Sequence, residues 1–251
     1  MDENKTARCE QCMTGKTLGF EFTMAFQPIV DVKNSTVFGY EALVRGVNGE
    51  SAYSIIQQVN GDNRYLFDQS CRVKAISLAA ELGLTKKLSI NFLPNAVYQP
   101  ERCIRTTLQE AKRVGFPIEN IMFEVTEVEK VLDNNHLKVI FDYYQKQGFS
   151  VALDDFGAGY AGLNLLADLT PNIVKLDMGL IRDIDASLSR QVIVHNTVKM
   201  LHELGCDVLA EGVETQGELD CLRAFGIDLF QGYFFARPTL EALPEVGFSV
   251  L

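Results

Sequence analysis

The chain has 251 residues, of which 47% are hydrophobic, and its formal net charge is −10 at pH 7. This length and apolar content are enough to bury a large core, and a single barrel domain of this size is common. The negative charge argues against binding to duplex DNA or RNA, which depends on basic patches, and no apolar run approaches the roughly 20 residues that span a bilayer.

The first 20 residues are polar and predict a flexible leader before a domain over residues 21–251. The leader lacks the basic start and apolar run of a signal peptide. Its Cys9-Glu-Gln-Cys12 spacing is found in zinc sites and redox pairs, but no matching second half follows at zinc-ribbon distance, so two reduced thiols are the alternative. The other cysteines are scattered, which is typical of a reducing compartment, and we expect a cytoplasmic protein.

Two strands are expected next, over residues 22–31 and 36–45. The turn residues between them, Asp31–Asn34, predict an antiparallel hairpin. Glu41 lies inside the second strand, where a buried glutamate is costly unless it is paired or bound to a metal. A salt bridge to Arg45 is the alternative, although two side chains on one face of a strand do not necessarily meet at their tips. The cost of burial favours the metal interpretation.

Beyond the hairpin, helical and strand patterns alternate. Helical periodicity covers residues 51–84 and is clearest over 67–80. Strands are expected over 88–93, 121–127, 150–154, 173–177, 207–211 and 229–231, and helices over 101–114, 137–147, 163–167, 189–204 and 216–225. Continuous apolar strands separated by helices predict a parallel sheet covered on both faces. We therefore predict an α/β fold, a TIM-type (β/α)8 barrel with an antiparallel first strand.

The strand over 150–154 ends in two adjacent carboxylates, Asp154 and Asp155, which a Gly-Ala-Gly segment follows closely. Neighbouring carboxylates repel each other and are costly to bury. Divalent cations remove this penalty, and an aspartate whose two oxygens face different ions can bridge them. A helix N-cap is the alternative, since aspartate is common at that position. The motif alone does not decide between the two.

Other polar residues also fall at the carboxyl ends of predicted strands. With Glu41 they form one set: Asn91, Glu124, Asp154, Asp155, Lys175, Asp177 and Glu211. TIM-barrel active sites are built at this end of the barrel. Oxygen ligands without histidine or cysteine suit Mg²⁺ or Mn²⁺ rather than zinc. The histidines lie in or beside predicted helices, so we interpret them as solvated or packing residues: His136, His195 and His202.

These motifs form seven ordered blocks. They are Glu41-Ala-Leu43 with Arg45, Asn91-Phe92, Phe123–Glu127, Asp154–Gly157, Val174–Asp177, Glu211–Glu214 and Gln231–Pro238. Together they resemble the EAL-domain family of bacterial phosphodiesterases, which hydrolyse cyclic di-GMP, over roughly residue 20 to the C-terminus. The resemblance implies a hydrolase that cleaves cyclic di-GMP to linear pGpG with a metal-activated water.

The resemblance also implies a role for each matching position. The first cation, Mg²⁺ or Mn²⁺, would be held by Glu41, Asn91, Glu124 and Asp154. Asp154 would bridge to a second ion, which Asp155 and Glu211 complete. The residues implied in catalysis are Lys175, Glu211, Asp155 and Glu127, of which Lys175 contacts the attacking water and Glu127 holds the loop after Asp154–Gly157. The positions implied in holding substrate are Gln27, Arg45, Asp177, Gln231 and Pro238.

Three other functions compete with this one. A non-catalytic EAL module that binds cyclic di-GMP as a receptor would typically lack a metal ligand, and none is missing here. A barrel hydrolase for another phosphodiester is separable by substrate competition. A purely structural domain leaves the strand-end carboxylates unexplained. We further expect a homodimer.

Overall fold

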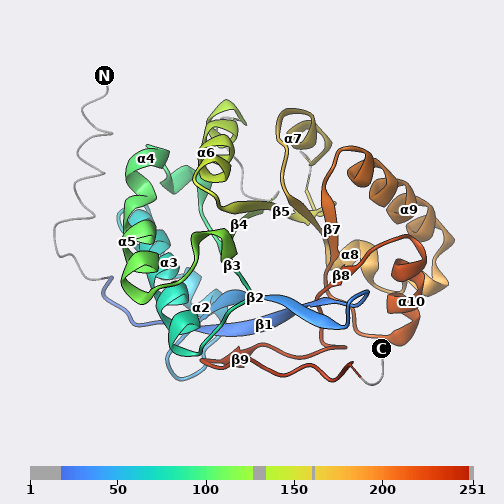
Figure 1. Cartoon of the computed structure of the whole chain (residues 1–251), viewed down its shortest axis with the longest axis horizontal. Coiled ribbons are helices and arrows are strands. Elements are labelled where there is room, and N and C mark those ends of the chain that lie inside the picture. Colours follow the sequence, from blue (N-terminus) through green and yellow to red (C-terminus); the bar gives the residue numbers. More distant parts are fainter. Residues whose placement is uncertain (1–17, 127–133, 160–161, 249–251) are drawn as a thin grey trace.

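The computed structural model describes residues 18–126, 134–159 and 162–248. The predicted leader, except for residues 18–20, and Glu127 lie outside these ranges. Eight strands form a closed barrel with helices around it (Figure 1), which confirms the predicted TIM-type fold. The barrel strands are β1 (Thr23–Asp31), β2 (Thr36–Arg45), β3 (Lys87–Asn91), β4 (Ile121–Thr126), β5 (Ser150–Phe156), β6 (Ile173–Leu176), β7 (Asp207–Ala210) and β8 (Leu229–Phe230).

The antiparallel strand is β1, as predicted. It pairs antiparallel with β2 on one side and with β8 on the other, whereas each pair from β2–β3 to β7–β8 is parallel. A short strand that the sequence did not predict, β9 (Thr239–Leu240), adds to β1 through the pairs Ala25–Leu240 and Phe26–Thr239. The chain after β8 therefore returns to the opening hairpin.

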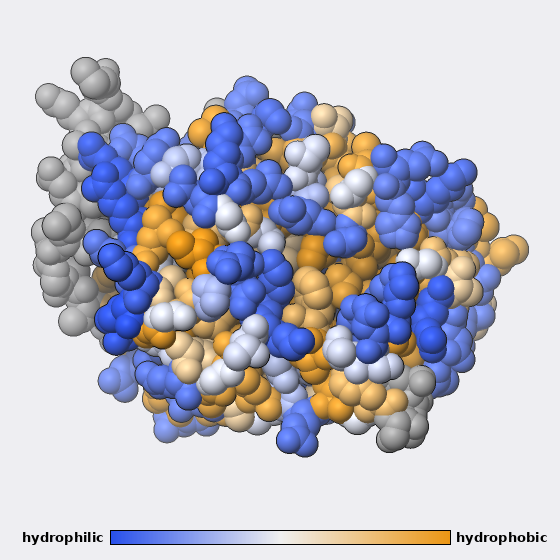
Figure 2. Space-filling model, viewed as in Figure 1, coloured by the Kyte–Doolittle hydropathy of each residue, from blue (hydrophilic) through white to orange (hydrophobic). Residues whose placement is uncertain are grey.

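The helices cover the outside of the barrel. They are α2 (Ala52–Ile56), α3 (Arg64–Glu81), α4 (Pro100–Cys103), α5 (Arg105–Val114), α6 (Asn134–Lys146), α7 (Gly162–Asp168), α8 (Met178–Ile181), α9 (Leu188–Glu203) and α10 (Gln216–Ala224), with 3₁₀ turns η2 (Pro94–Ala96), η3 (Ile118–Asn120) and η4 (Ile184–Ala186). Figure 2 shows hydrophilic residues mainly over these peripheral elements and apolar residues nearer the middle of the same face. None of the described helices has the length and apolarity that crossing a bilayer requires.

Two predicted helices are divided. The pattern over 51–84 contains α2 and α3, because the run Asn60–Asn63 forms a turn in which Asn63 Oδ1 accepts from the Asn60 backbone N–H at 2.7 Å. The helix predicted over 101–114 is α4 followed by α5, with Ile104 at the junction. The short helix α8 was not predicted, since four residues are too few to establish a helical period.

An apolar layer closes the interior of the barrel. It consists of Ile29, Met122, Ala152, Ile173, Leu209 and Leu229, which come from six strands and are 0–7% exposed. Side chains at positions i and i+2 of a strand lie on the same face. Any residue two positions from a member of this layer, toward the carboxyl ends of the parallel strands, therefore also points into the barrel, one layer higher.

Candidate functional site

The layer above the apolar one is polar. Six of its residues lie two positions from a member of the apolar layer: Gln27, Glu124, Asp154, Lys175, Glu211 and Gln231. Gln27 precedes its partner because β1 runs antiparallel to the other strands. Glu41 lies directly opposite Gln27 in the hairpin. The alternation of the strands thus gathers these side chains at one end of the barrel.

Lys175 lies at the centre of this polar layer. Its Nζ is 2.7 Å from Glu211 Oε1 and 2.9 Å from Glu124 Oε2. It is also 3.1 Å from Asp154 Oδ1 and 3.5 Å from Glu41 Oε2. The lysine side chain is fully buried. One ammonium therefore faces four carboxylates, and the cluster keeps an excess of negative charge.

Glu41 is held by amides rather than by Arg45. Its Oε1 accepts from Asn91 Nδ2 at 2.8 Å, and its Oε2 accepts from Gln231 Nε2 at 2.9 Å. Arg45 Nη1 instead donates to the carbonyl of Val44 at 2.7 Å. Glu41 and Arg45, both among the described residues, form no ion pair, so the alternative of a salt bridge to Arg45 is wrong; the cation that faces Glu41 is Lys175.

The pKa values in this cluster reflect burial and crowding of charge. Burial raises the pKa of Glu124 to about 8, with Glu41 and Asp154 adding to the rise and Lys175 opposing it. Burial, followed by the charges of Asp154 and Asp177, raises the pKa of Asp155 to about 6.

Burial and neighbouring charges also shift the pKa values of Lys175 and Glu211. Burial alone would lower the pKa of the Lys175 ammonium, but the surrounding carboxylates, led by Asp154, hold it well above its ordinary value. Burial raises the pKa of Glu211 well above its ordinary value. Without further positive charge, the cluster is therefore only partly ionised near neutral pH.

The oxygen atoms are arranged as two groups that share Asp154. Ligand atoms of Glu41, Glu124 and Asp154 lie within 4.8 Å of one another, and so do those of Asp154, Asp155 and Glu211. Glu124 Oε1 is buried and makes no hydrogen bond of good geometry within the described residues, although the nearby Ser89 hydroxyl acts on its charge. Hard divalent cations coordinate oxygens of this kind and would satisfy the unpaired one. The residues present therefore fit two cations.

Asp155 and Asp177 lie beside the cluster, Asp155 where the register of β5 is irregular and Asp177 directly after β6. Asp155 has a φ of 53°, in the left-handed region, and its backbone N–H donates to Asp154 Oδ1 at 2.9 Å. The residue that caps a helix here is Asp177, whose Oδ1 accepts from the Gly179 N–H at 2.8 Å at the start of α8. Neither Asp154 nor Asp155 makes an N-cap bond among the described residues, which disfavours the capping alternative for that motif.

A cavity of about 250 Å³ opens over this cluster. Six predicted site residues line it: Gln27, Glu41, Asp155, Asp177, Glu211 and Gln231. Arg45 and Pro238 are partly buried and do not line it. The sequence did not assign a role to the six other residues of its wall: Leu43, Met178, Gly212, Glu214, Gly232 and Tyr233. All of these except Met178 belong to the motif blocks Glu41–Leu43, Glu211–Glu214 and Gln231–Pro238, which was the available signal.

Glycines let the chain turn closely around this cavity. Gly212, next to Glu211, has a φ of +68°, and a Cβ there would lie 2.5 Å from Met178 Cβ. A Cβ at Gly232 would lie 2.0 Å from the Val213 carbonyl oxygen. Gly212 thus brings the segment after β7 against the start of α8, and Gly232 brings the segment after β8 against Val213, so that Glu211 and Gln231 line the same cavity.

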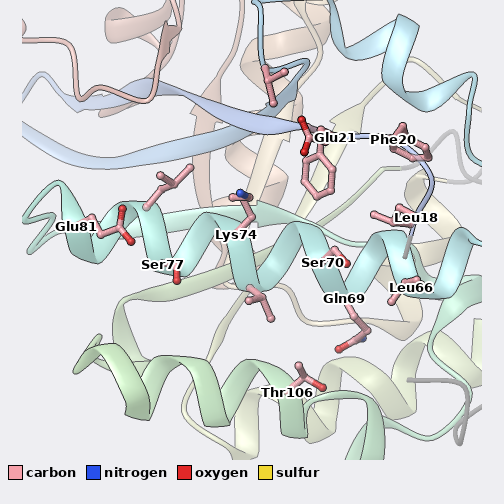
Figure 3. Close-up of a pocket in the computed structure, with 14 residues that line it drawn as sticks. Leu18, Phe20, Glu21, Leu66, Gln69, Ser70, Lys74, Ser77, Glu81 and Thr106 are labelled. Atoms are coloured by element: carbon pink, nitrogen blue, oxygen red, sulfur yellow. The ribbon is translucent and has the colours of Figure 1, made fainter. Parts of the chain in front are cut away.

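A larger cavity, of about 690 Å³, lies elsewhere. It is bounded by the segment around Phe20 and by α3, and Figure 3 shows Gln69, Ser70 and Lys74 along that helix. None of the clustered carboxylates lines it. Size therefore does not identify the functional site here, whereas the convergence of charged groups does.

The comparison with solved structures points to one family. A standalone versatile EAL protein from Vibrio cholerae O395, solved in its c-di-GMP-bound form, is 64% identical with a TM-score of 0.90, and the match covers 93% of this chain and 99% of that one. BlrP1 from Klebsiella pneumoniae, solved as a manganese/cy-diGMP complex at pH 9.0, is 34% identical with a TM-score of 0.85. That match covers 93% of this chain and 59% of the other.

Curated relatives agree. The blue light- and temperature-regulated antirepressor BluF of Escherichia coli K12 is 32% identical over 240 residues, covering 95% of this chain and 59% of BluF. The probable cyclic di-GMP phosphodiesterase PdeG of the same strain is 28% identical over 248 residues, covering 94% of this chain and 48% of PdeG. The chain thus spans about half the length of these two relatives. The family model described as EAL domain matches residues 16–238, and the chain belongs to the EAL-domain family.

Proposed function

We propose that the chain is a phosphodiesterase that hydrolyses cyclic di-GMP to linear pGpG with the aid of two divalent cations, Mg²⁺ or Mn²⁺. The observation that carries the proposal is the buried cluster in which, among the described residues, Lys175 is the one cation that faces four carboxylates and Glu124 Oε1 makes no hydrogen bond of good geometry. Related proteins solved with cyclic di-GMP, one of them together with manganese, support the choice of substrate and metal class.

In this proposal, the two carboxylate groups hold the cations. Glu41, Asn91, Glu124 and Asp154 hold the first, and Asp154, Asp155 and Glu211 hold the second. Such ions, when bound, supply a water that is acidic enough to attack at neutral pH and charge that stabilises an in-line displacement at phosphorus. They also offset the repulsion between a protein of net charge −10 and a dianionic dinucleotide.

The remaining residues act on the substrate. Lys175 stays protonated because of its carboxylate neighbours, so its ammonium is a fixed positive charge beside the phosphate during the displacement. Gln27, Asp177 and Gln231 line the cavity and are placed to hold the dinucleotide. Arg45 and Pro238 do not line it, and their assignment to substrate rests on the family resemblance alone. Glu127, which lies outside the described residues, is assigned to the loop after Asp154–Gly157.

A receptor that binds cyclic di-GMP without cleaving it is the alternative. It shares the cavity but does not require the full set of carboxylates. All of the proposed ligand positions carry a suitable side chain, which favours catalysis. Homodimerisation stays a prediction, and light scattering in solution tests it.

Turnover distinguishes the two functions. The purified chain, incubated with cyclic di-GMP and Mn²⁺, should give linear pGpG, detected by liquid chromatography. Glu41→Ala should abolish the product. Asp228→Ala is the matched control, because it removes a carboxylate from an exposed pair with Lys33, and it should leave the rate unchanged. Binding of the dinucleotide by the wild-type chain without any linear product would refute the proposal and establish the receptor.

A further inference from the structure

A second buried charged pair lies outside the cavity. Asp68 and Arg72, one turn apart on α3, form an ion pair in which Arg72 Nη2 is 2.7 Å from Asp68 Oδ2. Their side chains are 1% and 0% exposed. A pair buried this deeply is weak evidence for stability, because removing two charges from water offsets most of their attraction. The proposed chemistry does not use either residue, so the pair calls for another explanation.

Arg72 contacts the residues next to two of the proposed metal ligands. The carbon at the centre of its guanidinium is 5.5 Å from the centroid of the Phe92 ring and 5.1 Å from that of Phe123. Phe92 follows Asn91, and Phe123 precedes Glu124. Successive side chains of a strand point to opposite faces, so the rings face α3 while Asn91 and Glu124 face the barrel interior.

The same guanidinium is anchored on a further element. Arg72 Nη1 donates to the Tyr144 hydroxyl of α6 at 3.0 Å, and the Tyr144 ring centroid is 5.9 Å away. Tyr144 also packs against Phe92 and Phe123, with ring centroids 5.8 Å and 4.9 Å apart. The charged group therefore lies among three rings that are fixed to two strands and a helix.

Asp68 holds the chain directly after Asn91. Its Oδ1 accepts from the backbone N–H of Leu93 at 2.8 Å. Asn91 is the last residue of β3, and beyond it the Phe92 N–H still donates to the Glu124 carbonyl at 3.0 Å. The hydrogen bond from the Leu93 N–H to Asp68 thus attaches the segment directly after β3 to α3.

Packing alone does not fix that segment. A cavity of about 300 Å³, mostly apolar, borders Ile90, Asn91, Phe92 and Leu93 as well as Asp68. On that side the end of β3 lacks the close-packed neighbours that would hold it in place. The hydrogen bond from the Leu93 N–H to Asp68 and the stacking of Phe92 on Arg72 therefore contribute more to the position of Asn91.

We propose that the Asp68–Arg72 pair is a positioning device for the first cation: it holds Asn91 and Glu124, from outside the barrel, in the geometry that binds the metal. The inference rests on the proposed function, because the ligands are those assigned there. Residues behind metal ligands typically change metal affinity about 10–100-fold when removed. A pair that only fills the core would change stability and leave metal affinity alone.

The double substitution Asp68→Leu with Arg72→Met tests this. Replacing both charges by apolar side chains leaves no unpaired charge, so the fold should persist. We expect Mn²⁺ affinity, measured without substrate by electron paramagnetic resonance, to fall about 10–100-fold. Asp68→Asn keeps an oxygen that can accept from Leu93 but loses the ion pair with Arg72, so its Mn²⁺ affinity should fall by more than about twofold and by less than in the double variant. It also provides the same test if the double variant does not fold.

The matched control is Glu110→Gln. Glu110 is a buried carboxylate of α5 that pairs with Arg113 and accepts from Ser77 on the other side of α3. Its substitution should change the melting temperature and leave Mn²⁺ affinity unchanged. Affinity within about twofold of wild type in the Asp68 variants would overturn the positioning role alone. A wild-type chain that binds no Mn²⁺ would overturn the proposed function as well.

Discussion

Lys175 provides the most demanding prediction. Substituting it with methionine, which has a similar length and no charge, leaves four buried carboxylates without their cation. Breaking a buried ion pair by removing one partner costs about 3–5 kcal/mol. In a chain of this size, 1 kcal/mol lowers the melting temperature by roughly 2–4 °C, so the metal-free Lys175→Met variant should melt roughly 6–20 °C below wild type.

Thermal unfolding followed by circular dichroism measures this difference. Each protein is compared in EDTA and in Mn²⁺ near pH 8. At this pH, which is close to the Glu124 pKa of about 8, protons compensate less fully for the missing Lys175 ammonium than they do at lower pH. Mn²⁺ should recover most of the loss, because cations neutralise the same carboxylates. Lys33→Met is the control. Its ion pair with Asp228 is 68% and 50% exposed, and a pair of this kind contributes about 0–1 kcal/mol.

Two results would refute this reasoning. One is a Lys175→Met variant that melts within about 2 °C of wild type in EDTA, since the pair would then contribute no more than a surface pair. The other concerns catalysis. Loss of a charge that stabilises the displacement should lower kcat about 100- to 1000-fold, so a change confined to KM would reassign Lys175 to substrate binding.

The remaining predictions concern the carboxylates and their metals. Asp154→Ala removes the carboxylate that both groups share, so turnover should be lost while the far-ultraviolet spectrum is unchanged; residual turnover would remove Asp154 from the metal site. EDTA should stop hydrolysis, and Mg²⁺ or Mn²⁺ should restore it, whereas calcium should inhibit. Between pH 4.5 and about 8 the metal-free fold should lose stability, because folded Glu124 retains a proton that the unfolded chain has released. Over the same interval Mn²⁺ should bind more tightly as it displaces that proton, so its effect on the melting temperature should grow, and a constant effect would contradict the assignment.

The sequence was sufficient to predict that the strand-end carboxylates gather at one mouth of the barrel. The bounds of β2, Thr36–Arg45, match the predicted strand, because apolar residues and clear turn residues mark both of its sides. Parallel strands place their carboxyl ends together, so Glu124, Asp154 and Glu211 could be expected at one mouth without knowledge of the helices.

The environment of Lys175 was not predictable from local pattern. The sequence places Lys175 and Asp177 on one face of their strand, yet Lys175 is buried among carboxylates and Asp177 caps α8. The difference arises because α8 begins directly after Asp177, at the end of β6, so the Asp177 carboxylate caps that helix. Strand length depends on tertiary pairing, which a single strand does not reveal.

The pair behind the ligands was hidden for a similar reason. Asp68 and Arg72 fall within a helical pattern, where charges four residues apart usually lie on a solvated face. Their burial depends on Phe92, Phe123 and Tyr144, which come from distant parts of the chain. Only the packing of α3 and α6 around the barrel brings these groups together.

Mass spectrometry of the product shows whether clustered carboxylates from separate strands direct metal-dependent hydrolysis of cyclic di-GMP. The purified chain is incubated with the dinucleotide and Mn²⁺ in water enriched in ¹⁸O. We expect linear pGpG that carries a single ¹⁸O on its new terminal phosphate, formed with Mn²⁺ and absent in EDTA. Intact cyclic dinucleotide after incubation with the metal-loaded chain, or equal product with and without metal, would contradict it.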